Sequence, residues 1–202
     1  MSFAMNYNKT SICSVISLIC ALIRFWPLAH ASSEVRPEYQ VKALYLYNFL
    51  LFVDWPEKAF DTSGTFTIGI LGKDPFGEAF DPIKGKKIKG RKVMIKQFDR
   101  VQDLSFCHLL FISSSERSRM PRIIEKIKGW SVLTVSDMEG FVHLGGMIGF
   151  SNILAQDNLR NARGPMKKQR RFEINLTAAN QTGLKIRSRL LRLADIVQSN
   201  TK

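Results

Sequence analysis

The sequence predicts an α/β fold: a single-domain sandwich with a mostly parallel central sheet flanked by helices. Short runs rich in β-branched and aromatic residues alternate along the chain with stretches of helical periodicity, the pattern of strands joined by crossover helices. The 202 residues are 45% hydrophobic and 23% charged, so one ordinary globular core is expected. No internal repeat or linker-like stretch divides the chain, so we expect one domain.

The first predicted element of the domain is a helix over residues 38–53. It ends before Trp55-Pro56, because the residue that precedes a proline avoids helical geometry. Aromatic side chains are spread nearly all round this helix, so we expect it to be buried on more than one side.

Strands and short helices follow. A turn at residues 72–77 leads from the first strand into a short helix, and Pro121 suits the first turn of another. The last two strands have no helix between them, so an antiparallel hairpin is expected at that edge of the sheet. A final helix is predicted over residues 183–198, whose leucines form an apolar stripe. The strands are predicted at residues 65–71, 92–98, 108–113, 131–136, 147–152 and 171–177, and the middle helix at 121–128.

Residues 1–31 are interpreted as a cleaved signal peptide. Lys9 supplies the positive charge, residues 10–23 form an uncharged apolar stretch, and Ala29-His30-Ala31 fits the small-residue rule for cleavage. A membrane anchor is excluded by length, because about 20 apolar residues are needed to span a bilayer and Arg24 interrupts the run. We therefore expect residues 32–202 to form an exported, soluble domain.

Processing changes the balance of charges and cysteines. The whole chain carries a formal charge of +13, and removal of residues 1–31 takes Lys9 and Arg24 but no acid. The mature chain then has 28 basic against 17 acidic residues, a net charge of +11. Cys107 is the one cysteine left in it, so an internal disulfide is impossible, and its apolar neighbours predict a buried thiol.

The sequence contains no familiar catalytic constellation. It has no G-x-S-x-G, H-E-x-x-H, C-x-x-C or P-loop motif, and its three histidines are too scattered for a metal site. We therefore predict no enzymatic activity, no cofactor and no metal. The backbone amides of residues 72–77 could cradle an anion, although a tight βα turn is the simpler interpretation. Asp137 and Glu139 follow a predicted strand and are interpreted as caps of a short helix.

Basic residues are the main positive signal. One cluster lies between the last two predicted strands and a second lies at residues 84–92. For an exported protein, the available polyanions are membrane surfaces, anionic ligands and acidic faces of proteins, rather than nucleic acid. Solubility alone is the alternative explanation. The first cluster consists of Arg160, Arg163, Lys167, Lys168, Arg170 and Arg171.

Several segments, taken together, resemble the YfiR family of periplasmic proteins. Each segment is weak alone, but their succession along nearly the whole mature chain is specific. The segments are VKALYLYNF (41–49), FVDWP (52–56), GILGKDPFG (69–77), CHLLFIS (107–113), LTVSD (133–137), GGMI (145–148), RFEIN (171–175), AA (178–179) and GLKI (183–186), with Leu190-Leu191 and Leu193-Ala194 further on.

This resemblance implies regulation rather than catalysis. The best-known family member is a periplasmic repressor that acts on the sensor portion of an inner-membrane diguanylate cyclase, which restrains cyclic di-GMP synthesis and biofilm formation. An α/β sandwich and a homodimer are also implied. Family members can carry disulfides, and this chain departs from that pattern because Cys107 has no partner in the mature chain.

Two classes of function remain open from the sequence. In the first, the domain binds and represses the periplasmic portion of a diguanylate cyclase until a signal releases it. In the second, it binds a small anion without a dedicated protein partner. Period-two alternation places Arg171, Glu173 and Asn175 on one face of a strand, where they either bind the partner or hold the last helix to the sheet. The other candidate contacts are Arg160, Arg163, Lys167 and Lys168.

Overall fold

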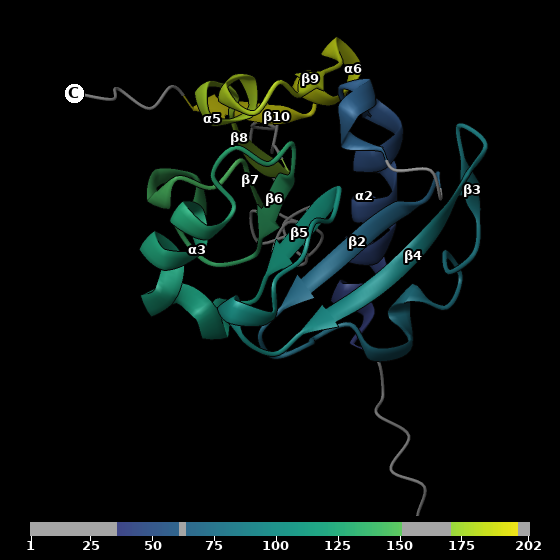
Figure 1. Cartoon of the computed structure of the whole chain (residues 1–202), viewed down its shortest axis with the longest axis horizontal. Helices are drawn as coiled ribbons and strands as arrows, with labels where there is room; N and C mark the ends of the chain where they lie inside the picture. The colour runs from purple at the N-terminus through teal and green to yellow at the C-terminus, as the bar shows by residue number, and fades with distance from the viewer. Residues whose placement is uncertain (1–35, 61–63, 151–170, 198–202) are drawn as a thin grey trace, which may run out of the picture. The chain divides into compact units, whose positions relative to one another are not determined.

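A computed structural model describes residues 36–60, 64–150 and 171–197. They fall in one compact unit built on an eight-stranded sheet with helices on both faces (Figure 1). The strands described in this sheet are β2 (Phe66–Leu71), β3 (Lys87–Ile88), β4 (Arg91–Phe98), β5 (Leu109–Ile112), β6 (Leu133–Ser136), β7 (Ile148–Phe150), β8 (Phe172–Asn175) and β10 (Ala194–Val197). The α-helices are α2 (Pro37–Phe52), α3 (Met120–Lys126), α5 (Leu176–Gln181) and α6 (Ser188–Leu191), and 3-10 turns include η2 (Gly77–Phe80), η3 (Val101–Asp103), η4 (Ser114–Arg119) and η5 (Phe141–Leu144).

The sheet is mostly parallel. Its strand order is β10-β8-β7-β6-β5-β2-β4-β3, and antiparallel pairing occurs only between β3 and β4 and between β7 and β8 among these described strands. The α/β prediction and the antiparallel pairing of β7 with β8 are therefore confirmed. From β2 the chain passes to β4 on one side and then returns to β5 on the other, so the strand order reverses between β2 and β5. In such sheets, ligand-binding crevices open at the carboxyl ends of the strands beside the reversal.

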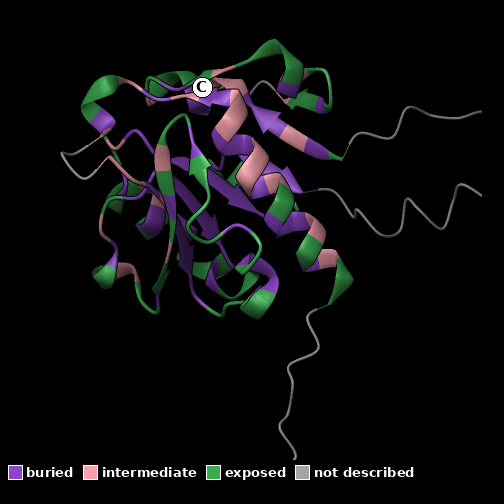
Figure 2. Ribbon diagram, turned by 90° about the vertical axis from the view of Figure 1, so that its right-hand side faces the viewer, coloured by how far each residue is buried: buried purple, intermediate pink, exposed green. Residues whose placement is uncertain are grey.

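Helix α2 covers one face of the sheet (Figures 1 and 2). It has proline in its first turn and ends at Phe52, three residues before Trp55-Pro56, close to the predicted limits. Leu46, Phe49 and Leu50 are completely buried against the strands. Its flanks are half-buried as well, which confirms the expected burial on more than one side.

Helix α3 and several 3-10 turns cover the opposite face. A second apolar cluster forms there, in which Met120 and Ile123 of α3 lie with Leu110 and Ile112 of β5. Cys107 belongs to this cluster and is completely buried, as predicted from its neighbours. Side chains of β5 thus alternate between two cores, one on each face of the sheet.

The predicted C-terminal helix over residues 183–198 is wrong. The chain there forms β9 (Lys185–Ile186), the four-residue α6 and the strand β10. Strand β10 pairs in parallel with β8 and lies at the edge of the sheet, where the sequence analysis placed the hairpin of β7 and β8. β9 pairs instead with β1 (Val53–Asp54), directly after α2. Leu184, Leu190 and Ala194 are buried at a helix-like spacing, but long-range strand pairing decides the local conformation here.

Helix α2, with 16 residues, is the longest helix among the described residues. None of the helices in this part of the chain has the length and apolar character needed to cross a bilayer.

Candidate functional site

A cavity of about 750 Å³ lies beside the point where the strand order reverses. Its walls come from the first two turns of α2, from the residues that follow β5 and β6, and from β7 and β8. Parallel strands bring their carboxyl ends to one edge of the sheet, which gathers Ser114, after β5, and Asp137, after β6, at the same opening. The fold therefore places a pocket where α/β sheets commonly bind ligands.

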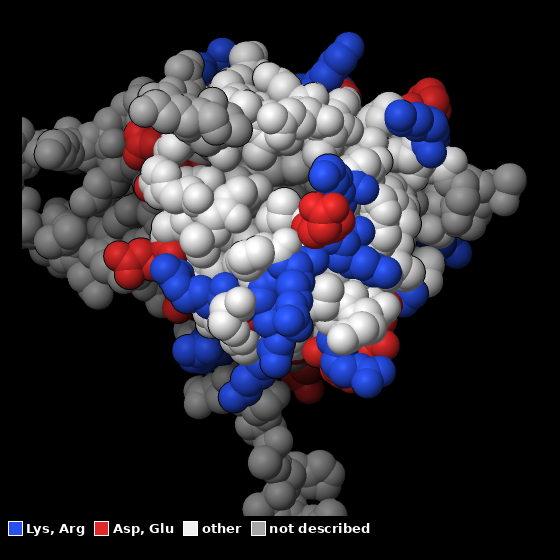
Figure 3. Space-filling model, turned by 60° about the vertical axis from the view of Figure 1, so that its left-hand side comes forward, with Lys and Arg blue, Asp and Glu red and all other residues white. Residues whose placement is uncertain are grey.

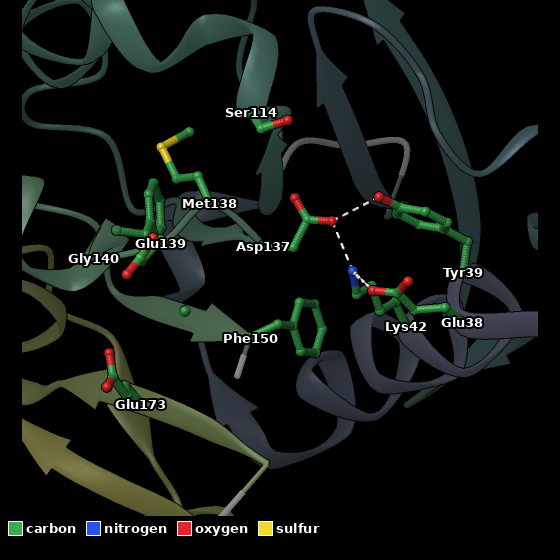
Figure 4. Close-up of a pocket in the computed structure, with 12 residues that line it drawn as sticks. Glu38, Tyr39, Lys42, Ser114, Asp137, Met138, Glu139, Gly140, Phe150 and Glu173 are labelled. Carbon is green, nitrogen blue, oxygen red and sulfur yellow. Dashed lines mark hydrogen bonds and ion pairs between the residues drawn. The ribbon is translucent and has the colours of Figure 1, made fainter. Parts of the chain in front are cut away.

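Asp137 connects the end of β6 to helix α2. Its Oδ2 atom accepts a hydrogen bond of 2.8 Å from the Tyr39 hydroxyl and one of 2.7 Å from the Lys42 ammonium (Figure 4). Lys42 also forms an ion pair with Glu38, one turn earlier in α2. The sequence interpretation of Asp137 as a helix cap is wrong, since its carboxylate binds side chains of α2 instead.

Lys42 occupies a position on the buried stripe of α2. Only 4% of its side chain is exposed, and its ammonium lies 4.4 Å from the centre of the Tyr39 ring. A buried ammonium is stable only where carboxylates or dipoles compensate its charge, and Asp137 and Glu38 do so here. The sequence carried a signal for this cluster that our sequence analysis missed: a lysine amid apolar residues at helical spacing.

The Tyr39 hydroxyl remains a hydrogen-bond donor over a wide pH range. Burial raises the pKa of Tyr39 above its ordinary value, and the hydrogen bond to the Asp137 carboxylate raises it further. The ring also packs edge-on against Phe76, at 5.3 Å between centroids, beyond the turn that follows β2. Tyr39 therefore links the pocket to the other side of the strand reversal.

Ser136 fixes the backbone that presents Asp137. Its hydroxyl donates to the Ile112 carbonyl at 2.7 Å and accepts from the Met138 amide at 3.0 Å, and the residue is completely buried. These bonds tie the end of β6 to the end of β5. The carboxylate is held in place by its neighbours on both sides rather than by a flexible loop.

The three residues that the sequence analysis placed on one face of a strand, Arg171, Glu173 and Asn175, make different contacts in the structure. Glu173 lines the pocket. Asn175 is buried, accepts from the Ala178 amide as the N-cap of α5, and donates to the Val142 carbonyl. Arg171 lies before the strand, and its guanidinium donates to the Tyr45 hydroxyl of α2. Of these three residues, the structure brings only Glu173 to the pocket.

The basic segment predicted to contact a partner lies outside the described residues. This applies to Arg160, Arg163, Lys167 and Lys168. The second basic cluster lies on the β3–β4 hairpin at one edge of the sheet. There, Lys89 pairs with Asp54 and the Arg91 guanidinium lies over the Phe60 ring, so part of this cluster holds the fold together.

A further basic surface appears on the side of the molecule that carries α3 (Figure 3). It includes a groove of about 640 Å³ whose described lining contains Arg100, Arg119, Arg122 and Lys126. Acidic residues interleave with these cations, and Glu116 pairs with Arg119. The sequence analysis did not single out this surface, because its members are spread over residues 100–126.

The turn at residues 72–77 is a structural turn. The Gly72 amide donates to the Phe98 carbonyl, the Lys73 amide to the Ser115 hydroxyl and the Phe76 amide to the Asp74 carboxylate. These three amides are therefore engaged within the protein and do not point together at a ligand. The simpler of the two sequence interpretations, a tight βα turn, is the one the geometry supports.

The pocket has the chemistry of a binding site. Its Asp137 carboxylate pairs with the Lys42 ammonium and accepts a hydrogen bond from the Tyr39 hydroxyl, and no described residue there combines a nucleophile with an adjacent general base. Across residues 36–60, 64–150 and 171–197, no three His, Cys, Asp or Glu side chains are grouped to hold a metal ion.

Comparison with models of protein families gives a match. A family model described as YfiR/HmsC-like matches residues 39–160 and 164–195, which is most of the chain and includes all the residues that line the pocket except Glu38. A search of curated proteins found none that matches. The chain belongs to the YfiR/HmsC-like family.

Proposed function

We propose that this protein is a periplasmic regulator that binds and restrains the periplasmic portion of an inner-membrane diguanylate cyclase. The observation that carries the proposal is the family match, which runs through residues 39–160 and 164–195. In this proposal residues 1–31 direct export and are removed, and residues 32–202 form the working domain. The protein acts by binding, as a homodimer, and catalyses no reaction.

The pocket beside the strand reversal supports a regulatory role. A regulator must respond to a signal, and a signal can shift an equilibrium only if it binds one state more tightly than another. The pocket wall contains the first two turns of α2, whose remaining length packs against the sheet. A molecule bound there would contact the helix and the strand ends at the same time, so its binding energy would depend on how α2 sits.

Partner contacts are proposed for the residues singled out from the sequence. Arg160, Arg163, Lys167 and Lys168 would meet an acidic face of the cyclase, in keeping with the net positive charge of the mature chain. Arg171 and Glu173 follow that segment directly, within the described part of the chain, and both are at least partly exposed. Asn175 is buried in a structural role, so its contribution would be to hold this region in shape.

The cellular test is deletion of the gene in its host, with intracellular cyclic di-GMP as the readout. Complementation uses the full-length chain and a version that lacks residues 1–31. We expect cyclic di-GMP to rise on deletion and to return to its normal level only with the exported form. An unchanged level after deletion, or full rescue by the version without residues 1–31, contradicts the proposal.

The binding test uses purified periplasmic domains of the host's diguanylate cyclases. Charge reversal to glutamate at Arg160, Arg163, Lys167 and Lys168 should weaken the association roughly tenfold at low salt and less at high salt. The matched control reverses Lys84, Lys86, Lys87 and Lys92, which lie on the β3–β4 hairpin and in the turn directly before it, and changes the net charge equally. Equal losses in the two variants would mean that overall charge, rather than the segment, determines affinity.

A further inference from the structure

Strand β4 has a backbone edge that is only partly paired. The strand has eight residues and lies at the outer side of the sheet, but β3 pairs with its first two residues alone (Figure 1). One further residue is covered, because Val93 donates to the Lys86 carbonyl and accepts from the Gly85 amide. Gly85 has a positive φ of 73°, and the chain that precedes it turns away from β4. Beyond Val93, no described strand pairs with this side of β4.

The alternation of hydrogen bonds shows which backbone groups lie on the open part of this edge. In a parallel pair, every second residue directs both its N–H and its C=O toward the same neighbouring strand. The Phe98 carbonyl accepts from the Gly72 amide on the β2 side, whereas both groups of Val93 bond on the β3 side. Ile95 and Gln97 alternate in step with Val93, so their amides and carbonyls face the open edge. The described residues give these four groups no partner.

The side chains around this edge leave it accessible. Met94 is 54% exposed, and Lys96 and Gln97 are exposed as well. Ile95 is partly buried and packs against the core that α2 covers, so an apolar side chain placed beside it would extend that core. An uncovered edge with free backbone donors and acceptors is the surface to which an extended peptide adds as a further strand.

Positive charge surrounds the open edge. Residues 82–98 contain seven lysines and arginines and no acid. Two of the lysines, Lys84 and Lys89, are paired with aspartates outside this segment. The others give the edge a positive potential that attracts carboxylates. Cations to which the described chain gives no ion pair include Lys86, Lys87, Lys92 and Lys96.

A second copy of this chain fits the edge poorly. Two antiparallel β4 strands would pair all four open groups in one two-fold register, with Ile95 opposite Gln97. That register places two copies of Lys96 directly opposite each other, in a pair whose Cα atoms are about 4.5 Å apart. Like charges in this position destabilise a sheet, and lysine is a residue that keeps natural edge strands from pairing with themselves. The charge of the edge therefore favours an acidic occupant.

We propose that the open edge of β4 binds an extended acidic peptide segment of another protein, which adds to the sheet beyond Val93, antiparallel to β4 and in line with β3. Its backbone pairs with Ile95 and Gln97. Its carboxylates lie beside Lys92 and Lys96 on one face of the sheet, and its apolar side chains lie beside Ile95 on the other. The cyclase is proposed to meet residues 160–168, so this site goes beyond the proposed function and serves a second partner.

The experiment measures amide hydrogen exchange by NMR in purified residues 32–202, with and without a peptide. The probe is a heptapeptide of alternating valine and glutamate, blocked at both ends. In the free protein, the Ile95 and Gln97 amides should exchange rapidly, whereas those of Met94 and Lys96, which face β2, should be protected. At a peptide concentration about ten times its Kd, exchange at Ile95 and Gln97 should slow roughly tenfold, with no change at Met94 and Lys96.

Two N-methylated peptides test the backbone pairing. Opposite residues of an antiparallel pair share a face, so the valines of the probe lie opposite Ile95 and Gln97 and direct their amides to β4. N-methylation of the valines should therefore weaken binding roughly tenfold or more. N-methylation of the glutamates, whose amides face away from β4, is the matched control and should have a much smaller effect.

Charge is tested on both molecules. A probe with glutamine in place of glutamate should bind roughly tenfold more weakly at low salt, and the difference should shrink at high salt. Lys96→Glu should weaken binding of the acidic probe roughly fivefold. The matched control is Lys128→Glu, which follows α3, changes the net charge equally and replaces a side chain that is 75% exposed. It should leave the affinity nearly unchanged.

The outcomes separate this inference from the proposed function. Unchanged exchange at Ile95 and Gln97 with the peptide, equal weakening by the two N-methylated peptides, or equal weakening by Lys96→Glu and Lys128→Glu would overturn the strand site. Protection of Ile95 and Gln97 in the free protein that disappears on dilution would mean that a second copy occupies the edge, which also contradicts the proposal. The change in cyclic di-GMP on gene deletion is independent of all these results.

Discussion

Lys42 is the residue on which the pocket most depends. Its ammonium is removed from water, so the cost of burial is offset only by its bonds to Asp137 and Glu38 and by the Tyr39 ring. Its two partners lie at very different distances along the sequence: Glu38 is one helical turn away, whereas Asp137 is 95 residues away. The Lys42 ammonium therefore joins a local contact within α2 to a tertiary contact with the end of β6.

Replacement of Lys42 tests this role. Lys42→Met keeps the length of the side chain but leaves the Asp137 and Glu38 carboxylates without their cation, so the free energy of unfolding should fall by about 2–4 kcal/mol. Urea denaturation measures the change. Lys84→Met is the control, because its pair with Asp81 is more than half exposed and should contribute at most about 1 kcal/mol. Equal effects of the two substitutions would show that Lys42 is not compensated as described.

Asn175 has two possible roles, a contact with the partner or a structural role within the domain, and substitutions can distinguish them. Its side chain caps α5 and donates to the Val142 carbonyl from a buried position. Asn175→Ala should lower the free energy of unfolding by about 1–3 kcal/mol, because it removes a cap and leaves a buried carbonyl unsatisfied. Asn175→Ser retains the capping oxygen and should lose less. Weakened partner binding with unchanged stability would instead favour a direct contact.

Among the elements, the junction at Asp54 joins three segments that are distant in the sequence. Asp54 lies in β1 directly after α2, and its carboxylate accepts from Arg187, which precedes α6, and from Lys89 between β3 and β4. These two cations lower the pKa of Asp54 from 3.8 to about 2. Because the pKa is lower in the folded state, the carboxylate stabilises the fold above its unfolded pKa, and this contribution disappears as the pH falls toward 2.

The pH dependence of stability tests the Asp54 junction. Asp54→Asn should be less stable than the wild-type protein at neutral pH, and the difference should vanish as the pH falls from 3.8 toward 2. The effect will be modest, at most about 1 kcal/mol, because 41% of the Asp54 side chain is exposed. Arg187→Gln should flatten the same pH profile, since Arg187 is the main cause of the shift. A gap between wild type and Asp54→Asn that is independent of pH would contradict the assignment.

Elements whose conformation is determined by nearby residues were predicted correctly from the sequence, whereas an element determined by tertiary contacts was not. The limits of α2 and the strand β2 follow from a proline and from a run of β-branched residues, and both were predicted. The strand β10 was taken for part of a helix, because its pairing with β8 is a tertiary choice that overrides a helical spacing of leucines. Glu173 was named from strand alternation, but the pairing of Lys42 with Asp137 requires the positions of α2 and β6 in space.

At the scale of the whole molecule, stability comes from two apolar cores without covalent support. In the proposed mature chain Cys107 is the one thiol, and burial raises its pKa to about 12. A thiol that is neither exposed nor ionised is a poor nucleophile. The family resemblance allows for disulfides elsewhere, but the sequence of residues 32–202 leaves no pair to form one within a chain.

Redox chemistry should therefore leave the folded protein unchanged. Purified residues 32–202 should have the same unfolding midpoint with and without a reducing agent, and Cys107 should react with a thiol reagent only after denaturation. Thermal unfolding and thiol labelling measure these two properties. Rapid labelling of the native protein, or a midpoint that falls on reduction, would show that Cys107 is accessible or forms a bridge between chains.

The pairing of β7 with β8 has a consequence for how the protein can evolve. Phe150 and Phe172 are direct partners across this antiparallel pair, so the two strand ends that flank residues 151–170 lie side by side. Such ends can be joined by a turn of a few residues. Insertions, deletions and changes of charge between them need not disturb the sheet, so natural selection can alter the specificity of this region while the scaffold remains the same.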